Sequence, residues 1–121
     1  MHWLETFFAL ICGHALADFV LQPPAMSQGK IRKRLADTSL PNGSHSAQLP
    51  SWQYWLTAHS LVHGGIVFLI TGSLLLGLVE TAIHWFIDFC KCEGWIKLRT
   101  DQLLHLVSKV FYLLVLYDFP T

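Results

Sequence analysis

The fold is decided by residues 52–92, WQYWLTAHSLVHGGIVFLITGSLLLGLVETAIHWFIDFCKC, which contain two long apolar segments. His59 and His63 lie four apart in the first segment, and His84 and Asp88 lie four apart in the second. Residues at this spacing share one face of an α-helix, one turn apart. Because apolar helices rarely carry such side chains without a functional reason, we expect the two faces to meet at one polar centre.

The same spacing recurs in the two remaining apolar segments of the chain. His14 and Asp18 form the pair near the N-terminus, and Asp101 and His105 form the pair near the C-terminus. A polar stretch opened by two prolines separates the first segment from the second, since proline cannot continue a helix. We therefore predict an all-α fold in a single domain, residues 1–121, with helices over about 3–22, 52–71, 75–92 and 100–117 and a linker over 23–51.

Composition favours a membrane protein. Hydrophobic residues make up 53% of the chain and charged residues 13%, and the mean hydropathy is +0.44. Each segment is close to the roughly 20 residues that cross a bilayer as a helix. A soluble chain this short would have more apolar surface than its interior can hold. The expectation is a four-helix transmembrane bundle, with a soluble bundle of long buried helices as the alternative. The first segment lacks a basic start, so we read it as a helix rather than a signal peptide.

Basic residues give the orientation of the predicted bundle. The net charge is zero, which gives no indication of nucleic-acid binding. If four helices span, seven of the eight Lys and Arg residues fall on one side: Lys30, Arg32, Lys33, Arg34, Lys91, Lys97 and Arg99. The positive-inside rule makes this side cytoplasmic and both termini extracytoplasmic.

Helices of alternating direction bring the four polar pairs to one depth in the cytoplasmic leaflet. His14, His59, His84 and His105 form a ring roughly 10 Å below the boundary, at 1.5 Å of rise per residue. The aspartates lie nearer the surface, whereas His63 and Glu80 lie deeper. This convergence predicts a single centre shared by all four helices.

Imidazole and carboxylate side chains together suit zinc, iron or manganese, and we expect one or two such ions in the centre. The candidate ligands are His14, Asp18, His59, His63, His84, Asp88, Asp101 and His105. An aspartate that is not a ligand can act as a general base, which makes Asp18, Asp88 and Asp101 the candidate catalytic residues. The candidate substrate-binding residues at the rim are Gln22, Lys30, Lys91 and Gln102.

Other interpretations of these residues stay open. The aspartates and histidines can hydrogen-bond between helices without any metal. Cys90-x-Cys92 can ligate a soft metal, although small apolar filler is the preferred interpretation. Lys30 belongs to a basic run that sets topology and meets anionic lipid, or it grips a phosphate headgroup. His2 and His45 fall outside the pattern and are expected at the surface.

The motif set resembles a known family. It consists of His14-x3-Asp18-Phe19-x-Leu21-Gln22, Lys30, His59-x3-His63, His84-x3-Asp88-x2-Lys91 and Asp101-Gln102-x2-His105. It is similar to a family of small bacterial and phage-borne membrane proteins catalogued as a domain of unknown function. Members usually show Gly-Asp-Phe where this chain has Ala17-Asp18-Phe19. The resemblance implies a multi-pass protein of the bacterial inner membrane and supplies no activity.

Three functions compete on this basis. The first is a metal-dependent membrane hydrolase that acts on a lipid-like or phosphorylated substrate from the cytoplasmic leaflet. The second is a proton or metal-ion transporter or channel subunit, with the histidines and carboxylates as relay steps. The third is a non-catalytic structural protein held together by polar contacts. Membrane lipid is the expected partner, nucleic acid is not, and the small size of the bundle is consistent with a homodimer.

Overall fold

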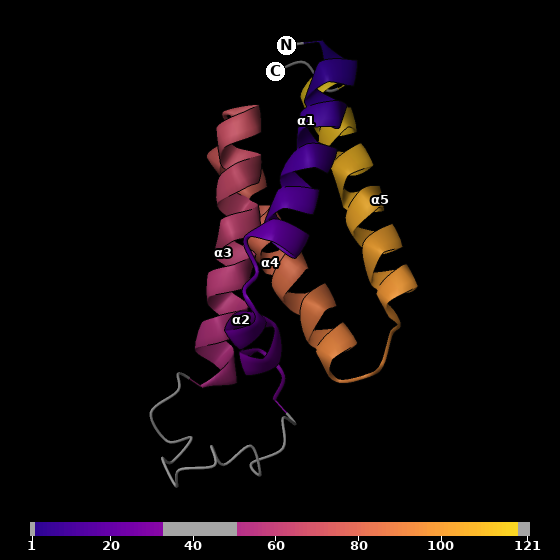
Figure 1. Cartoon of the computed structure of the whole chain (residues 1–121). Coiled ribbons are helices and arrows are strands. Elements are labelled where there is room, and N and C mark those ends of the chain that lie inside the picture. Colours follow the sequence, from indigo (N-terminus) through magenta and orange to yellow (C-terminus); the bar gives the residue numbers. More distant parts are fainter. Residues whose placement is uncertain (1, 33–50, 119–121) are drawn as a thin grey trace, which may run out of the picture.

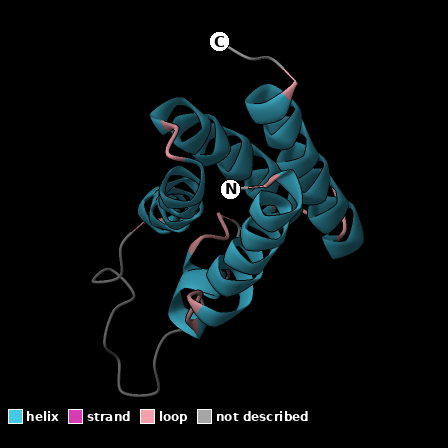
Figure 2. Cartoon of the chain, turned by 90° about the horizontal axis from the view of Figure 1, so that it is seen from above, coloured by secondary structure: helices cyan, strands magenta, loops and turns pink. Residues whose placement is uncertain are grey.

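The computed structural model describes residues 2–32 and 51–118, and every element in these two ranges is helical (Figure 2). The first helix, α1 (Trp3–Ala15), begins after His2, whose Nδ1 accepts a hydrogen bond from the N–H of Leu4 at 3.3 Å. Glu5 accepts the N–H of His2 at 2.9 Å and completes a capping box. His2 is exposed, as predicted, whereas His45, Lys33 and Arg34 lie outside the described residues.

A π-helical turn, η1 (Leu16–Val20), continues α1. The N–H of Leu21 donates to the carbonyl of Leu16, five residues back, at 2.8 Å. Such a turn holds one more residue than an α-helical turn and is frequent at functional sites. Asp18 lies inside it, and its Oδ2 is 3.5 Å from Nε2 of His14, so the predicted pair still shares one face across the change from α-helix to π-helix.

A short helix, α2 (Pro24–Gly29), follows. Pro23 occupies the N-cap and Pro24 the first helical position, where the missing N–H and fixed φ of proline suit a helix. The two prolines therefore end one helix and start another, and the predicted linker contains an element that the sequence analysis did not expect.

The three remaining helices are α3 (Trp52–Thr71), α4 (Leu74–Cys92) and α5 (Leu98–Tyr117). Gly72 ends α3 in the left-handed conformation, with φ of 72°, and Ser73 then caps α4 by accepting the N–H of Leu76 at 3.2 Å.

The helix α5 begins two residues before the predicted position, with Lys97 at its N-cap. Gly94, at φ of 80°, makes the turn that precedes it. Asp101 lies within the first turn of this helix and is fully buried. Its carboxylate is therefore available to the centre of the bundle.

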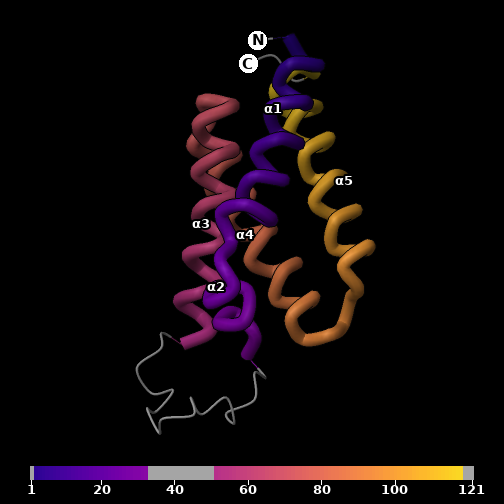
Figure 3. Tube along the Cα trace, in the orientation of Figure 1, coloured from indigo at the N-terminus to yellow at the C-terminus, as the bar shows by residue number. Residues whose placement is uncertain are grey.

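The four long helices run up and down in turn, with α2 at the lower end of α3 (Figures 1 and 3). α1 packs against α3, α3 against α4, α4 against α5, and α5 against α1, so all four surround one axis. Thr6 Oγ1 and Tyr117 Oη lie 2.7 Å apart, which joins the start of α1 to the end of α5. The start of α1 and the end of α5 therefore lie at the same end of the bundle.

The closest helix pair, α3 and α4, depends on two glycines. A Cβ on Gly64 would overlap Oγ1 of Thr81, and a Cβ on Gly77 would lie 2.9 Å from the carbonyl oxygen of Gly64. Small residues at a crossing let two helix backbones approach, as is common between helices in membranes. This approach fixes the rotation of α3 and α4 and turns their histidines toward each other.

The interior of the bundle is more polar than its surface. Among the described residues, polar and charged side chains outnumber apolar ones in the buried set, while large apolar side chains such as Phe8, Leu69 and Phe86 are exposed. Two helical stretches, Trp3–Val20 and Trp52–Thr71, are long and apolar enough to cross a membrane. Soluble proteins normally show the opposite distribution of polar and apolar side chains.

Candidate metal centre

Each long helix delivers polar side chains to the centre of the bundle. α1 supplies His14, the π-helical turn η1 supplies Asp18, and α3 supplies His59 and His63. The other two helices supply Glu80, His84 and Asp88 from α4 and Asp101, Gln102, His105 and Lys109 from α5. All of these except His14 and Gln102, which are half-buried, are buried, so the centre is closed to bulk solvent on most sides.

Asp18 joins the helices at the centre. Its Oδ1 lies 3.2 Å from Nε2 of His59 and 3.2 Å from Nε2 of His63. Its Oδ2 accepts a hydrogen bond from Nε2 of Gln102 at 2.7 Å and lies 3.5 Å from Nε2 of His14. One carboxylate thus contacts α3, α5 and its own helix, which explains why the chain places a charged residue on an apolar segment.

The imidazole rings form a continuous stack across the bundle. The His63 and His84 rings lie 3.6 Å apart between centroids, and the His84 and His105 rings lie 4.4 Å apart, in both cases nearly parallel. His59 meets His84 edge to face at 4.9 Å, and His14 lies 5.0 Å from His105. Five histidines from four helices therefore share one small volume.

Several ring nitrogens in this stack have no hydrogen-bond partner among the described residues. They include both nitrogens of His84 and of His105 and the Nδ1 atoms of His14 and His59. Buried polar atoms are nearly always satisfied in folded proteins, and unsatisfied ones indicate a ligand, an ion or water. Ring nitrogens are the atoms with which histidine binds metals.

Two groups of ligand atoms are compact enough to hold a metal ion. Asp18, His59, His63 and His84 form one group, whose ligand atoms all lie within 4.8 Å of one another. Glu80, His84 and His105 form the other under the same limit, so His84 belongs to both. The first group offers three nitrogens and one carboxylate oxygen, a donor set suited to zinc or iron.

Asp88 lies at the edge of the first group and contacts two lysines. Its Oδ2 accepts a hydrogen bond from Nζ of Lys30 at 2.7 Å, and its Oδ1 lies 3.0 Å from Nζ of Lys91. The same Oδ2 lies 3.7 Å from Nε2 of His59 and 3.9 Å from Nε2 of His84. Asp88 thus links the imidazoles to the basic end of the bundle.

The position of Lys30 corrects the sequence analysis. Its place in a basic run favoured a side chain at the lipid surface, but Lys30 is only 3% exposed and pairs with Asp88. α2 makes this possible, because Lys30 follows its last residue and is carried over the end of the bundle. Composition indicated the sign of this charge but not its burial.

Asp101 and Gln102 occupy the same end of the centre. Oδ1 of Asp101 lies 3.3 Å from Nε2 of His105, and its Oδ2 accepts a hydrogen bond from Gln102 at 3.0 Å. Gln102 also contacts Nε2 of His14 through its Oε1 at 3.1 Å. Lys91 completes this end, with Nζ 3.7 Å from Oδ2 of Asp101 and a side chain that is 22% exposed.

Gln22 and the cysteines contribute less than the sequence suggested. The side chain of Gln22 donates to the backbone carbonyl of Asp18 at 3.0 Å and so supports η1 rather than the carboxylate. Sγ of Cys92 lies 4.0 Å from Oδ1 of Asp88, and neither compact ligand group includes a cysteine of the described chain. The preferred interpretation of Cys90 and Cys92 as filler agrees with this placement.

Sequence reasoning missed a buried triad on the far side of the histidines. Glu80 accepts hydrogen bonds from Nζ of Lys109 and from Oη of Tyr112, both at 2.6 Å. Its Oε1 also lies 3.9 Å from Nδ1 of His63 and from Nδ1 of His84. A signal for the triad exists, because Lys109 continues the four-residue spacing of Asp101 and His105.

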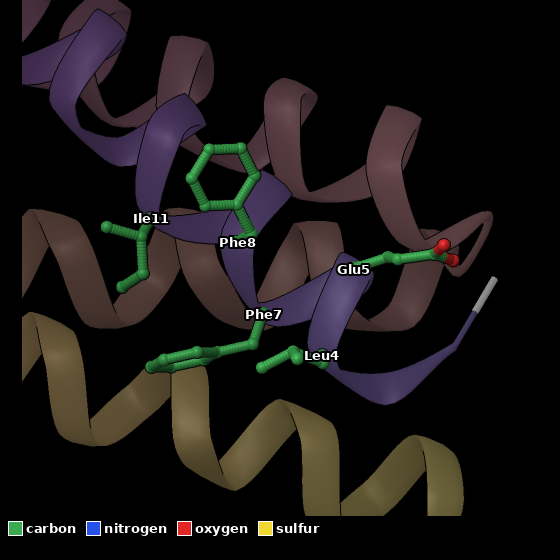
Figure 4. Close-up of a pocket in the computed structure, with 5 residues that line it drawn as sticks. All are labelled: Leu4, Glu5, Phe7, Phe8 and Ile11. Atoms are coloured by element: carbon green, nitrogen blue, oxygen red, sulfur yellow. The ribbon is translucent and has the colours of Figure 1, made fainter.

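The N-terminal part of α1 carries an apolar groove that is separate from these polar residues. Leu4, Glu5, Phe7, Phe8 and Ile11 line it (Figure 4). The only polar side chain among them, Glu5, is engaged in the helix cap. None of the lining residues belongs to either ligand group, so the groove is not part of the metal centre.

Comparisons with known proteins add a family and no activity. The sequence model of the family DUF3307, described as "Protein of unknown function", matches residues 6–119. The resemblance to a domain of unknown function predicted from the motifs is thereby confirmed. No curated protein and no solved structure matches the chain.

Proposed function

This chain belongs to the DUF3307 family, and we propose that it is an integral membrane protein with a divalent metal centre that hydrolyses a lipid-like or phosphorylated substrate at the cytoplasmic leaflet. The observation that carries the proposal is the buried group of Asp18, His59, His63 and His84. Its members come from three separate helical elements, and both nitrogens of His84 lack a hydrogen-bond partner among the described residues.

The distribution of side chains supports the membrane location. α1 together with η1, and α3, qualify as spans by length and hydropathy. α4 and α5 carry more charge, but Glu80, Asp88, Asp101 and Lys109 are buried within the bundle. The faces that α4 and α5 turn outward carry leucine, valine and phenylalanine. Ionisable residues in membrane helices normally face the bundle interior in this way.

The charges around the centre fit a divalent cation. Four carboxylates, on Asp18, Glu80, Asp88 and Asp101, lie within one buried cluster whose lysines are Lys30, Lys91 and Lys109. The four carboxylates exceed the three ammonium groups by one negative charge. One divalent ion would offset this charge and leave one positive charge, which an anionic substrate or a hydroxide would neutralise. The ion would supply Lewis acidity and lower the pKa of a bound water.

Asp101 is the best placed general base. Asp18 is held by His59, His63 and Gln102, and Asp88 is held by two lysines. Oδ1 of Asp101, in contrast, has no hydrogen bond among the described residues and lies 3.3 Å from Nε2 of His105, while Oδ2 lies 3.7 Å from Nζ of the partly exposed Lys91. A carboxylate in this state can accept a proton from an attacking water, while Lys91 binds an anionic group of the substrate and Gln102 holds Asp101 in place.

The shape of the polar region favours an enzyme over a transporter. Polar groups run from Lys91 and Asp101, past the imidazoles, to the Glu80 triad. Beyond the triad, Leu10, Val67 and Leu76 pack with Tyr112 into an apolar cluster. A polar region that is partly exposed at the Lys91 end and covered by apolar side chains at the other suits a substrate that enters and leaves by the same route. A transporter needs a second exit, so ion flux across vesicles containing the protein is the measurement that would favour transport.

Metal content is the decisive first experiment. The protein, purified in detergent without chelator, is analysed for bound metals by mass spectrometry beside His84→Ala and a control, His2→Asn. Asparagine is a good N-cap, so the control removes an exposed imidazole while preserving the start of α1. We expect bound zinc, iron or manganese in the wild type and the control, and loss of most of it in His84→Ala. A metal-free wild type would favour a purely structural role for the polar residues.

Activity is tested with the same three proteins on a phosphorylated lipid. Phosphatidate in detergent micelles is the probe, and released inorganic phosphate is the readout. We expect turnover that depends on added metal and falls at least 100-fold in His84→Ala, since metal-ligand loss removes several kcal/mol of transition-state stabilisation. Full activity in a folded His84→Ala protein would contradict the proposal.

A further inference from the structure

Lys30 enters the centre from outside the four long helices. It follows the last residue of α2, beside the lower end of α3 (Figure 1). Its side chain is nearly fully buried, and its Nζ lies 2.7 Å from Oδ2 of Asp88. A lysine ammonium in such a place requires a specific anionic partner, because an unpaired buried charge is very unfavourable.

The oxygen that Lys30 holds is the one that faces the imidazoles. Oδ2 of Asp88 lies 3.7 Å from Nε2 of His59 and 3.9 Å from Nε2 of His84. Donor atoms around one tetrahedral zinc ion lie about 3.3 Å apart, given bonds of about 2.0 Å. These separations therefore need only a small contraction to bind a common ion. The other oxygen of Asp88 is paired with Lys91 and points away from this position.

α2 does not need Lys30 to stay in place. Arg32 donates two hydrogen bonds to the carboxylate of Glu93, both at 2.8 Å, from Nε and from a terminal nitrogen. These bonds raise the pKa of Arg32 above its ordinary value and keep the pair charged. Gly29 packs so closely on the ring of Trp55 that a Cβ there would overlap it. The Lys30 side chain can thus swing out while α2 remains attached to α3 and α4.

We propose that Lys30 is a built-in competitor of the metal ion. Its ammonium group holds Oδ2 of Asp88 when no ion is bound. A divalent cation held by the group of Asp18, His59, His63 and His84 displaces it toward the end of the bundle when Asp88 joins His59 and His84 as a ligand. The inference rests on the proposed metal centre and adds a regulation of it. Lys30 compensates the buried carboxylate in the metal-free protein and lowers the affinity for metal by the free energy of this displacement.

The direction in which one substitution changes the metal affinity distinguishes competition from structural support. Lys30→Met keeps the length of the side chain and removes its charge, while Lys91 still pairs with Asp88. If Lys30 competes with the ion, the variant binds metal more tightly. If Lys30 only supports the site, the variant binds metal equally or more weakly. Arg32→Gln is the matched control, because it weakens the attachment of α2 and leaves the Lys30–Asp88 pair intact.

The first measurement is zinc affinity in detergent, by competition with a chelating dye. We expect Lys30→Met to bind zinc at least roughly tenfold more tightly than the wild type, the effect of losing one charge-assisted hydrogen bond. Arg32→Gln is expected within about twofold of the wild type. Equal or weaker binding by Lys30→Met overturns the competition. If the wild type does not bind zinc, iron or manganese at all, the proposed metal centre is wrong, and the proposed competition is then wrong as well.

The second measurement uses the wild type alone and does not depend on the folding of a variant. Lysines are acylated briefly with and without zinc, and each site is quantified by mass spectrometry. Displacement predicts that zinc raises the modification of Lys30 several-fold, whereas the exposed Lys97 reacts equally in both states. Unchanged or reduced modification of Lys30 in a protein that binds zinc would show that the lysine stays on Asp88.

Discussion

At the scale of single residues, Asp18 contacts side chains of three helices, α1, α3 and α5. Both of its oxygens are used, Oδ1 by His59 and His63 and Oδ2 by Gln102. Asparagine has nearly the same shape and one oxygen, but it carries no charge. A substitution at this position therefore separates the charge that a metal needs from the packing that the bundle needs.

We predict that Asp18→Asn lowers zinc affinity at least roughly tenfold, because an amide oxygen is a much weaker ligand than a carboxylate. The measurement is dye competition in detergent, with circular dichroism to monitor helix content. Asp118→Asn, exposed at the end of α5, is the control and should bind as the wild type does. Wild-type affinity in Asp18→Asn would remove Asp18 from the ligands.

Acidity gives a second test at this scale. Imidazole nitrogens and carboxylate oxygens bind metals only without their protons, so protons and the ion compete for the same atoms. Zinc affinity should therefore fall as the pH is lowered from 7 to 4, and zinc binding in weak buffer near the lower end of this range should release protons. A pH-independent affinity over this range would mean that neither the histidines nor the carboxylates are the ligands. Isothermal titration in two buffers of different ionisation enthalpy measures the protons directly.

At the scale of elements, the crossing of α3 and α4 sets which histidines meet. Gly64 lies against Thr81 and Gly77 in this crossing, whereas a Cβ on the neighbouring Gly65 would meet nothing within 4 Å. His63 precedes Gly64, and its ring stacks on His84 at 3.6 Å. A change that separates the two helices should therefore disturb the centre as well as the packing.

We predict opposite effects for alanine at these two glycines. Gly64→Ala should destabilise the protein by about 1–3 kcal/mol through overpacking and weaken metal binding. Gly65→Ala should be neutral or stabilising by up to about 1 kcal/mol, because alanine favours the helix. Thermal unfolding in detergent gives the comparison. Equal stability of the two variants would argue against the close crossing.

At the scale of the whole molecule, the basic residues define one end of the bundle. Lys30, Lys91 and Lys97 lie at the end where α2 and the turn between α4 and α5 are found, while the start of α1 and the end of α5 lie at the other (Figure 3). A membrane protein with this arrangement has its basic end in the cytoplasm. We therefore expect the partly exposed Lys91 end of the centre to face the cytoplasm.

We predict that a reporter fused after the last residue lies outside the cytoplasm. Alkaline phosphatase at this position should be active in whole bacterial cells, and green fluorescent protein should be dark. The control is a fusion truncated after residue 96, in the turn before α5, which should give the reverse pattern. A fluorescent C-terminal fusion would reverse the orientation and place the opening of the centre on the other face.

The sequence by itself determined which residues share a helix face and, through its motifs, the family of the chain. Four-residue spacing on apolar segments is enough for this, because the geometry of an α-helix fixes the faces. The spacing indicated the histidines, Asp88 and Asp101 without any knowledge of packing.

The tertiary structure decided how far those helix faces are rotated toward one another and which further side chains lie between them. The close approach at Gly64 stacks His63 on His84, and the π-helical turn at Asp18 departs from the α-helical repeat. Lys30 is buried because α2 carries it over the bundle end, and Lys109 because Glu80 is opposite. Spacing along one helix contains no information about such partners, since burial of a charge depends on an opposite charge on another element.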